Sequence, residues 1–247
     1  MFVCFFCFFQ AERILVIGGG AVGVELLGEI KHKYPKKFVT LVHSHADLIS
    51  ANKLKPEFHK RVLKKVRAYP DVKVILEDRV VLDDELKAAS SHRYLAGKRT
   101  VKTQKGESID TDLVFFTIGG KPNSNFVSKL FPDKVNEKGE VKVNRFLQVE
   151  GFENIFAAGD ITNIQEGKQA TSAKPQAETA VVNIQNLIAK RPLKAYGGGM
   201  VGMALTLGPY ASLAPLFFPR RKLTRISFLS LSFKETWCGP ALWQDPW

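Results

Sequence analysis

The chain has 247 residues, of which 45% are hydrophobic and 24% are charged, so it has the composition of an ordinary folded protein with a sizeable core. Its three cysteines, Cys4, Cys7 and Cys238, are too few and too far apart for a disulfide-stapled fold. No cysteine lies between Cys7 and Cys238, which excludes a redox-active pair inside a nucleotide-binding domain. Because this composition fits a reducing compartment, we expect a cytoplasmic protein.

The net charge is +12, and much of the excess lies between Lys31 and Lys73, a stretch that includes a basic helix predicted over residues 54–69. Such a basic face suits an anionic cofactor, an anionic membrane surface or nucleic acid, although a solvated helix face explains it more simply. No motif of nucleic-acid-binding proteins accompanies it, so we expect no nucleic-acid partner.

Residues 1–10 form an apolar N-terminal segment that is too short to span a bilayer and lacks the features of a signal peptide. Its Cys4 and Cys7 have no second pair, which argues against metal or redox chemistry. The other candidate ligand pair, His43 and His45, lies in a polar stretch without carboxylate or cysteine partners. We therefore predict no metal site.

Residues 13–30 carry the strongest signal in the chain, a strand, a glycine turn and a helix in succession. Ile14 to Ile17 form a short apolar run, as expected of a parallel strand that is buried on both faces. The pattern G-x-G-x-x-G follows, and it leads into apolar residues at helical spacing. The turn predicts a cradle for the phosphates of a dinucleotide, formed by Gly18, Gly19, Gly20, Ala21, Val22 and Gly23.

Each glycine of the pattern has its own physical role. Gly18 permits a turn that most side chains forbid, Gly20 lets a pyrophosphate approach the backbone, and Gly23 lets the helix pack close to the strand. The unpaired N–H groups and the positive end of the helix dipole then favour an anion at the turn.

With Val24 and Glu25 after the glycines, this stretch resembles the NAD(P)H-binding motif of the FAD/NAD(P)-binding pyridine nucleotide-disulfide oxidoreductase superfamily. It is most similar to the branch of apoptosis-inducing-factor and ferroptosis-suppressor-like NAD(P)H:quinone oxidoreductases. The resemblance covers Arg13 to about Gly202. It implies an α/β fold, with a Rossmann-like NAD(P)H domain followed by the C-terminal part of an FAD-binding domain, and it places Glu25 in a catalytic position near the nicotinamide and the flavin.

Residues 38–43 predict the second parallel strand, and the identity of its last residue bears on the choice of coenzyme. Dinucleotide folds usually place Asp or Glu about 20 residues past the glycines, where it binds the ribose 2′-hydroxyl of NAD. This chain has His43 there, and Asp47 follows several residues later. We therefore predict that NADPH binds within about tenfold of NADH, helped by the basic residues of segment 31–37.

The segment from residue 54 to residue 117 predicts the remainder of the nucleotide domain. The helix predicted over residues 54–69 has Phe58, Val62 and Val66 on one face. Strands are predicted over residues 72–77, 79–82, 100–103 and 112–117. The segment from Thr117 to Asn123 resembles the A-T-G-like segment that ends this domain in the family, with Gly119 in a cofactor-binding position.

Residues 154–160 (NIFAAGD) form the second candidate site. A buried strand is predicted to deliver Gly159 and Asp160 to the carboxyl edge of a sheet, where open α/β sheets bind ligands. A turn aspartate that caps the next element is the simpler alternative. The resemblance favours a flavin site, in which Asp160 bonds the ribityl chain of FAD and in which Gly159 and Lys168 are further cofactor-binding candidates.

A helix is predicted over residues 168–173 and 176–189, with Pro175 either in its first turn or as a kink in a longer helix. Its apolar face is predicted to comprise Ala177, Ala180, Val181, Ile184, Leu187 and Ile188. In relatives the N-terminal end of this helix faces the flavin, where its dipole would stabilise the negative charge of the reduced ring.

The predicted organisation has four segments, which are the apolar residues 1–10, an NAD(P)H-binding domain over 11–117, a partial FAD-binding domain over 118–195, and a C-terminal tail over 196–247 whose end has no assignment. Relatives hold the FAD adenine and pyrophosphate with an earlier Rossmann unit. Because twelve residues precede Arg13, we expect that N-terminal FAD half to be missing and FAD to be held weakly.

The resemblance implies the function as well. Members of the family pass electrons from NAD(P)H through FAD to a quinone-like small-molecule acceptor, so FAD and NAD(P)H are the expected cofactors, and a peripheral membrane surface is a candidate partner. The alternative is a truncated, catalytically silent NAD(P)-binding module, or pseudoenzyme.

Overall fold

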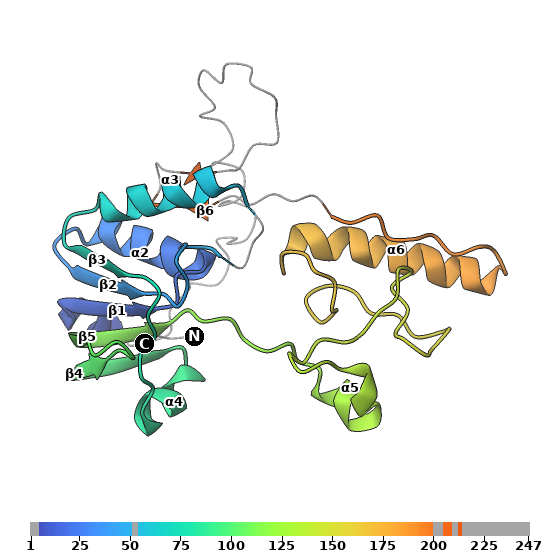
Figure 1. Ribbon diagram of the computed structural model, residues 1–247, viewed down its shortest axis with the longest axis horizontal. Helices are drawn as coiled ribbons and strands as arrows, with labels where there is room; N and C mark the ends of the chain where they lie inside the picture. The colour runs from blue at the N-terminus through green and yellow to red at the C-terminus, as the bar shows by residue number, and fades with distance from the viewer. Residues whose placement is uncertain (1–4, 51–53, 200–204, 209–211, 214–247) are drawn as a thin grey trace, which may run out of the picture. The chain divides into compact units, whose positions relative to one another are not determined.

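The computed structural model describes residues 5–50, 54–199, 205–208 and 212–213 (Figure 1). These residues belong to the first of two compact units, residues 1–215. The second unit, residues 216–247, lies outside the described residues, and so does most of the predicted tail over 196–247.

The first half of the chain builds a five-stranded sheet in the order β3-β2-β1-β5-β4. The strands β1, β2, β3 and β5 run parallel, and β4 pairs antiparallel with β5 at one edge. This is the predicted α/β architecture with a mostly parallel sheet. The strands span Arg13–Ile17 (β1), Phe38–Val42 (β2), Val72–Ile75 (β3), Tyr94–Lys102 (β4) and Ser108–Phe116 (β5).

The central strand β1 is buried on both faces, as its unbroken apolar run predicted. Ile14 and Val16 belong to one core cluster, which also contains residues of α2 and α3, whereas Leu15 and Ile17 belong to a second cluster with residues of α4 and β5. Alternate side chains of a strand point to opposite faces, so one short apolar run supplies both cores.

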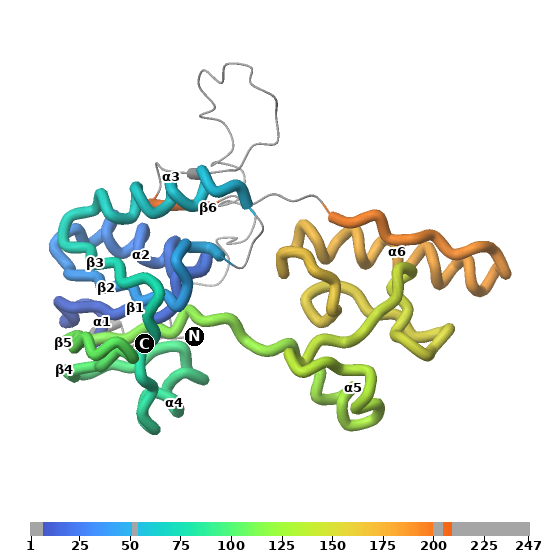
Figure 2. The backbone as a smooth tube through the Cα atoms, in the orientation of Figure 1, coloured from blue at the N-terminus to red at the C-terminus, as the bar shows by residue number. Residues whose placement is uncertain are grey.

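Helices cover the two faces of this sheet. Figures 1 and 2 show α2 and α3 together on one face and α4 on the other. The side chain of Asp83 accepts a hydrogen bond from the Leu86 N–H and so caps the start of α4. The helices span Phe5–Gln10 (α1), Ala21–Lys33 (α2), Pro56–Arg67 (α3) and Asp84–Ser90 (α4).

The helix α3 confirms the predicted amphipathic pattern. Phe58, Val62 and Val66 are buried, and the lysines and arginines of α3 lie on its exposed side. The simpler interpretation of this basic stretch, a solvated helix face, accounts for what the structure shows of it.

Several strand predictions in the first half of the chain need correction. The strand predicted over residues 72–77 ends at Ile75, because Glu77 has a φ of 56° that leaves extended geometry. The strand predicted over 79–82 is reduced to an isolated bridge between Val80 and Thr103. The strand predicted over 100–103 is the end of a longer one, β4, which starts at Tyr94 and pairs with β5.

Residues 125–199 build a separate core of their own around Val141, Val143, Leu147, Val149 and Ala180. Much of this part is irregular, with short bridges between loops. Its regular elements are the helices Asn125–Leu130 (α5) and Ala170–Ile188 (α6) and the short 3₁₀ helix Pro132–Lys134 (η1). Two further short strands, Leu205–Thr206 (β6) and Ser212–Leu213 (β7), pair with each other.

The strand predicted before Gly159 does not form. Phe156 makes an isolated bridge with Gln148, and Ile155 is exposed, so residues 154–158 are an irregular segment and not a buried strand. A strand that is buried on both faces belongs to a sheet with other elements packed on each face, and neither sheet among the described residues includes this segment.

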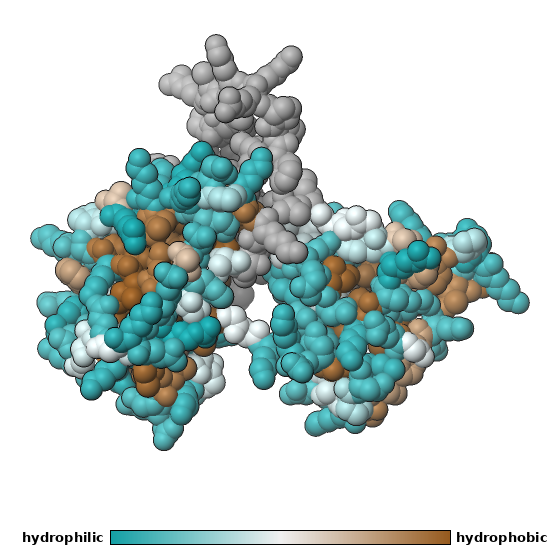
Figure 3. Space-filling view, viewed as in Figure 1, coloured by the Kyte–Doolittle hydropathy of each residue, from teal (hydrophilic) through white to brown (hydrophobic). Residues whose placement is uncertain are grey.

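The helix α6 also differs from its prediction. It runs through Pro175 without ending there, and most of its predicted apolar face is exposed, with exposed fractions of 55% at Val181 and 78% at Ile188. Figure 3 shows hydrophobic side chains at the surface along this helix. Its buried residues are mainly polar, namely Ser172, Gln176, Thr179, Ala180 and Asn183.

No helix among the described residues has the length and apolar character required to cross a bilayer.

Candidate functional site

The glycine turn has the conformation that its sequence predicted. Gly18 has a φ of 113°, and a Cβ there would lie 2.9 Å from the backbone of Thr117. A Cβ on Gly23 would lie 2.0 Å from the carbonyl oxygen of Gly18, which is far inside van der Waals contact. Gly18 therefore allows the turn, and Gly23 allows α2 to start directly against β1.

The other two glycines of the turn, Gly19 and Gly20, have different roles. A Cβ on Gly19 would meet Leu48 at 2.5 Å and the ring of His43 at 2.8 Å, so Gly19 is needed for packing. A Cβ on Gly20 would meet no atom within 4 Å, and Gly20 lines a pocket. The backbone at Gly20 therefore lies open to a ligand, as a phosphate cradle requires.

The helix α2 directs its N-terminus at this opening. It begins at Ala21, and Gly20, which precedes it, provides no side-chain cap. The first N–H groups of a helix have no partner within the helix, and the helix dipole makes this end positive. An anion held here would take hydrogen bonds from the backbone and would not need a side chain.

The pocket has a volume of about 820 Å³ and follows the carboxyl ends of the parallel strands. Thr117, directly after β5, lines the pocket, and its hydroxyl donates to the carbonyls of Ile17 at 3.0 Å and Gly18 at 2.7 Å. The predicted candidate Gly119 also lines the pocket, and a Cβ on it would meet nothing within 4 Å. The predicted members Ala21 and Val22 lie just outside the lining, on the first turn of α2.

His43 fixes the turn to the end of β2. Its Nδ1 accepts a hydrogen bond from the Gly19 N–H at 3.0 Å, and its Nε2 lies 3.2 Å from the hydroxyl of Ser50. Burial lowers the pKa of His43, and the neighbouring His45 lowers it further. The imidazole is therefore neutral at pH 7, which keeps Nδ1 free of a proton and able to accept.

Lowering the pH should weaken the fold through this histidine. The pKa of His43 in the folded chain is below the unfolded value of 6.5, so as the pH falls the unfolded chain takes up a proton at this residue before the folded chain does. The stability that is present above pH 6.5 is therefore lost as the pH falls toward the pKa of the folded chain. We expect the free energy of unfolding to fall between pH 7 and pH 5, and to fall less in His43→Gln. Urea unfolding at both pH values measures the free energy of unfolding. The control is His92→Gln, because His92 is exposed. An equal fall in the wild type and both variants would contradict the prediction.

The basic residues of segment 31–37 do not reach this pocket, which corrects their predicted role. The ammonium of Lys31 donates to the carbonyls of Pro35 and Lys37, and that of Lys37 donates to the carbonyls of Phe9 and Ala11. These groups lie at the end of α2 and before β2, so they are at the amino edge of the sheet. The pocket lies at the carboxyl edge.

Glu25, the predicted catalytic residue, lies outside the pocket lining. Its Oε1 accepts hydrogen bonds from the N–H and the hydroxyl of Thr206, at 3.0 and 3.2 Å. The neighbouring Leu205 and Leu207 are buried in the core with α2 and α3, and the Tyr69 hydroxyl donates to the Leu207 carbonyl at 3.0 Å. Glu25 thus holds segment 205–208 against α2, and its catalytic role stays a prediction.

The second candidate site is a loop around Gly159 and Asp160. Gly159 has a φ of 83°, its N–H donates to Gln176 Oε1 at 2.8 Å, and its carbonyl accepts from the N–H and hydroxyl of Thr162. The Asp160 carboxylate is exposed. This arrangement fixes the loop beside the N-terminal half of α6 and leaves the carboxylate free to bond a ligand hydroxyl.

A partly buried polar network that sequence reasoning missed supports this loop. Gln176 Nε2 donates to Glu166 Oε2 at 3.2 Å, and the same carboxylate accepts from the Tyr196 hydroxyl at 2.9 Å and from the Gly199 N–H at 2.7 Å. Burial and the Glu166 carboxylate raise the pKa of Tyr196 to about 12. The signal available in the sequence was Gln176, a polar residue early in a helix predicted to be apolar on one face, because a glutamine that is buried needs hydrogen-bond partners.

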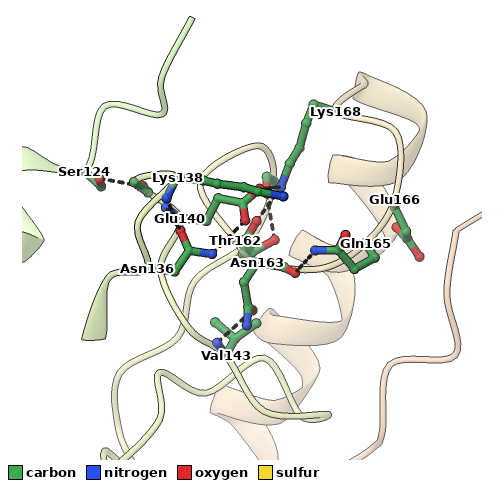
Figure 4. Close-up of polar contacts among 12 residues, drawn as sticks. Ser124, Asn136, Lys138, Glu140, Val143, Thr162, Asn163, Gln165, Glu166 and Lys168 are labelled. Atoms are coloured by element: carbon green, nitrogen blue, oxygen red, sulfur yellow. Dashed lines mark hydrogen bonds and ion pairs between the residues drawn. The ribbon is translucent and has the colours of Figure 1, made fainter. Parts of the chain in front are cut away.

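Lys168, a predicted FAD-binding residue, lies among protein partners in Figure 4. Its ammonium donates to the Thr162 carbonyl and pairs with Glu140 Oε1 at 3.3 Å. Glu140 also accepts a hydrogen bond from Asn136 Nδ2 at 2.9 Å, and this bond and Lys168 hold the pKa of Glu140 below its usual value. Lys168 thus closes a loop within this core, and its contact with a cofactor stays a prediction.

Strand, glycine turn and helix, with a pocket at the carboxyl ends of parallel strands, define a dinucleotide-binding α/β protein. The sequence pattern of the family described as pyridine nucleotide-disulphide oxidoreductase matches residues 9–185, which is most of the chain. The protein belongs to this family, and the predicted superfamily and fold are confirmed.

Individual relatives agree with this assignment. Ferroptosis suppressor protein 1 of Mus musculus is 36% identical over 220 residues, which make up 88% of this chain and 57% of that protein. Apoptosis-inducing factor homolog A of Dictyostelium discoideum is 40% identical over 174 residues, covering 66% of this chain and 42% of that protein. The chain spans about half the length of the curated relatives it matches.

Among solved structures, a pyridine nucleotide-disulfide family oxidoreductase from Enterococcus faecalis V583 superposes with a TM-score of 0.62 at 21% identity. The alignment covers 84% of this chain and 46% of that chain. An engineered water-forming NADPH oxidase bound to NADPH superposes with a TM-score of 0.58 at 23% identity, covering 82% of this chain and 42% of that chain. These likenesses support the fold.

Family membership implies FAD and NAD(P)H as cofactors, and the two fit this chain to different degrees. The open backbone at Gly20, the uncapped start of α2 and the strand-end pocket fit the phosphates and the body of a nicotinamide coenzyme. For FAD the described residues offer the loop at Gly159 and Asp160 beside α6. The described residues contain one unit of strand, glycine turn and helix of the kind that binds a dinucleotide, at residues 13–33.

Proposed function

We propose that this protein is an NAD(P)H oxidoreductase that uses FAD to pass electrons to a quinone-like acceptor. The observation that carries the proposal is the glycine turn, where Gly18 and Gly23 are sterically obligatory and Gly20 opens into the strand-end pocket. Packing within the protein does not require a glycine at position 20, whereas a phosphate cradle requires open backbone there.

Each residue of the two candidate sites has a binding role that follows from its position. Gly18 to Gly23 bind the coenzyme pyrophosphate, with α2 contributing its dipole, and Thr117 holds the turn in shape. His43 and Gly119 line the coenzyme pocket, and Asp160 binds a hydroxyl of the flavin side chain. The bound cofactors supply the redox chemistry, so the protein needs to supply orientation and electrostatics but no nucleophile.

We propose the predicted division into an NAD(P)H-binding domain over residues 11–117 and a partial FAD-binding domain over 118–195. The separate core clusters support it, since residues up to Phe116, joined by Leu205 and Leu207, form two of them and residues from Val127 to Tyr196 form the third. The basic exposed face of α3 supports a further part of the proposal, a peripheral association with an anionic membrane surface from the cytoplasm.

The test is quinone-dependent oxidation of NADH and NADPH, followed by the absorbance of the reduced coenzyme at about 340 nm with a short-chain quinone and excess FAD. We expect turnover that requires the coenzyme, FAD and the quinone together. Tight coenzyme binding without turnover under saturating FAD would instead support the second candidate function, a silent NAD(P)-binding module. The exposed apolar face of α6 favours that second candidate for this chain by itself.

A further inference from the structure

Arg79 lies on the loop after β3, and this loop is tied to the residues that follow β2. The Glu77 N–H donates to the His45 carbonyl at 3.2 Å, and the Asp78 N–H donates to the His43 carbonyl at 3.2 Å. The Arg79 carbonyl accepts from a neighbouring turn, at the N–H of Gln104. The loop therefore holds Arg79 at a fixed place beside the strand end where a dinucleotide fold positions the adenosine ribose.

The guanidinium of Arg79 is available for a ligand. Arg79 is exposed and lines the same pocket as Gly18, Gly20 and His43. Its side chain makes no hydrogen bond or ion pair with any residue that the structure describes. Lys31 and Lys37, the cations that the sequence suggested, are engaged at the opposite edge of the sheet.

The carboxylates near the pocket are not suited to bind a ribose hydroxyl. Asp78 is the one carboxylate among the lining residues that the structure describes, and its Oδ1 accepts hydrogen bonds from the N–H groups of Arg79 at 2.7 Å and Lys105 at 3.2 Å. Burial acts to raise the pKa of Asp78, but hydrogen bonds from Thr103, Arg79 and Lys105 outweigh it and hold this pKa low. Asp47 does not line the pocket.

The surroundings of Arg79 instead favour an anion. The rings of His43 and His45 lie 5.3 Å apart, and both histidines line the pocket with Ser44 and Arg79. After burial, electrostatic interactions with His45 and then with Arg79 lower the pKa of His43, which indicates that both residues lie close to its ring. The pocket thus offers the Arg79 guanidinium, the His45 ring and the Ser44 hydroxyl, and no uncommitted carboxylate.

We infer that Arg79, with His45 and Ser44 beside it, forms a subsite for the 2′-phosphate of NADPH, and that Arg79 determines the preference for NADPH over NADH. A guanidinium binds a phosphate through two parallel N–H bonds, whereas it has no comparable partner on the 2′-hydroxyl of NADH. This inference rests on the proposed function, because it assigns the coenzyme of the same site.

The experiment measures dissociation constants of NADPH and NADH by fluorescence titration for the wild-type chain, Arg79→Gln, Arg79→Lys and Arg61→Gln. Arg61 is exposed on α3 and outside the pocket, so its variant makes the same change in net charge elsewhere. We expect the wild type to bind NADPH about tenfold more tightly than NADH. Arg79→Gln should weaken NADPH about tenfold and NADH less than about twofold, Arg79→Lys should weaken NADPH by an intermediate factor, and Arg61→Gln should match the wild type.

A competition with two isomeric ligands separates a phosphate subsite from general attraction. Adenosine 2′,5′-bisphosphate and adenosine 3′,5′-bisphosphate carry equal charge, so the wild type should prefer the 2′ isomer and Arg79→Gln should lose that preference. Equal binding of the isomers to the wild type, or equal losses of NADPH and NADH in Arg79→Gln, would overturn the inference and leave the proposed function standing. A wild type that binds neither coenzyme would overturn both, and melting temperatures show that each variant is folded.

Discussion

Gly20→Val should lose coenzyme binding while the chain stays folded. Gly20 has an extended backbone with φ −72° and ψ −176°, which any residue adopts, and a Cβ there meets no protein atom within 4 Å. The added side chain would fill the space where the pyrophosphate must approach the backbone. We expect at least about a hundredfold weaker binding of both coenzymes, equivalent to about 2.8 kcal/mol, and a cost in stability of about 1 kcal/mol for the less favourable residue before α2.

Two other glycine variants make this result specific. Gly197→Val is the matched control, because a Cβ on Gly197 also meets nothing within 4 Å but Gly197 lies outside the pocket. It should bind both coenzymes like the wild type. Gly23→Val should destabilise the fold itself, since its Cβ would lie 2.0 Å from the Gly18 carbonyl oxygen. Coenzyme titrations with melting curves measure all three, and unchanged affinity in a folded Gly20→Val would show that the phosphates bind elsewhere.

The purified 247-residue chain should retain little FAD, in fewer than about one molecule in ten. The described residues offer the exposed Asp160 carboxylate, and one charge-assisted hydrogen bond contributes about 1.5 to 3 kcal/mol. Micromolar binding requires roughly 8 kcal/mol. The exposed apolar residues of α6, including Val181, Ile184 and Ile188, should also make this chain prone to association.

The ratio of flavin absorbance near 450 nm to protein absorbance measures FAD retention directly. A titration with added FAD then gives the dissociation constant, and Asp160→Asn should weaken it further if that carboxylate binds the flavin side chain. A yellow protein with close to one FAD per chain would contradict the expectation, and it would show that this chain, alone or as an oligomer, completes the flavin site.

The parts of the structure that the sequence predicted are those decided by local sterics and periodicity. The roles of Gly18, Gly20 and Gly23 follow from backbone geometry over six residues, and β1 follows from one apolar run. The buried face of α3 follows from 3.6-residue spacing, because that helix packs on a sheet made by its own neighbours in sequence.

The parts that the sequence did not predict depend on contacts between distant residues. The spacing of Val181, Ile184 and Ile188 predicted an apolar face, but spacing does not say whether another element covers it. The opposite side of α6 is buried, and Asn183 on that side donates to the carbonyls of Phe146 and Lys194, which are distant in the sequence. Arg79 was missed for the same reason, since 36 positions separate it from His43 in the sequence.

The central claim is that the strand-end pocket binds a nicotinamide coenzyme, and calorimetric titration of NADPH into the wild-type chain tests it most directly. The account predicts saturable binding of one NADPH per chain with a dissociation constant in the micromolar range, about −8 kcal/mol, and competition by NADH. Absence of saturable binding by a folded chain, or binding that NADH does not displace, would contradict it.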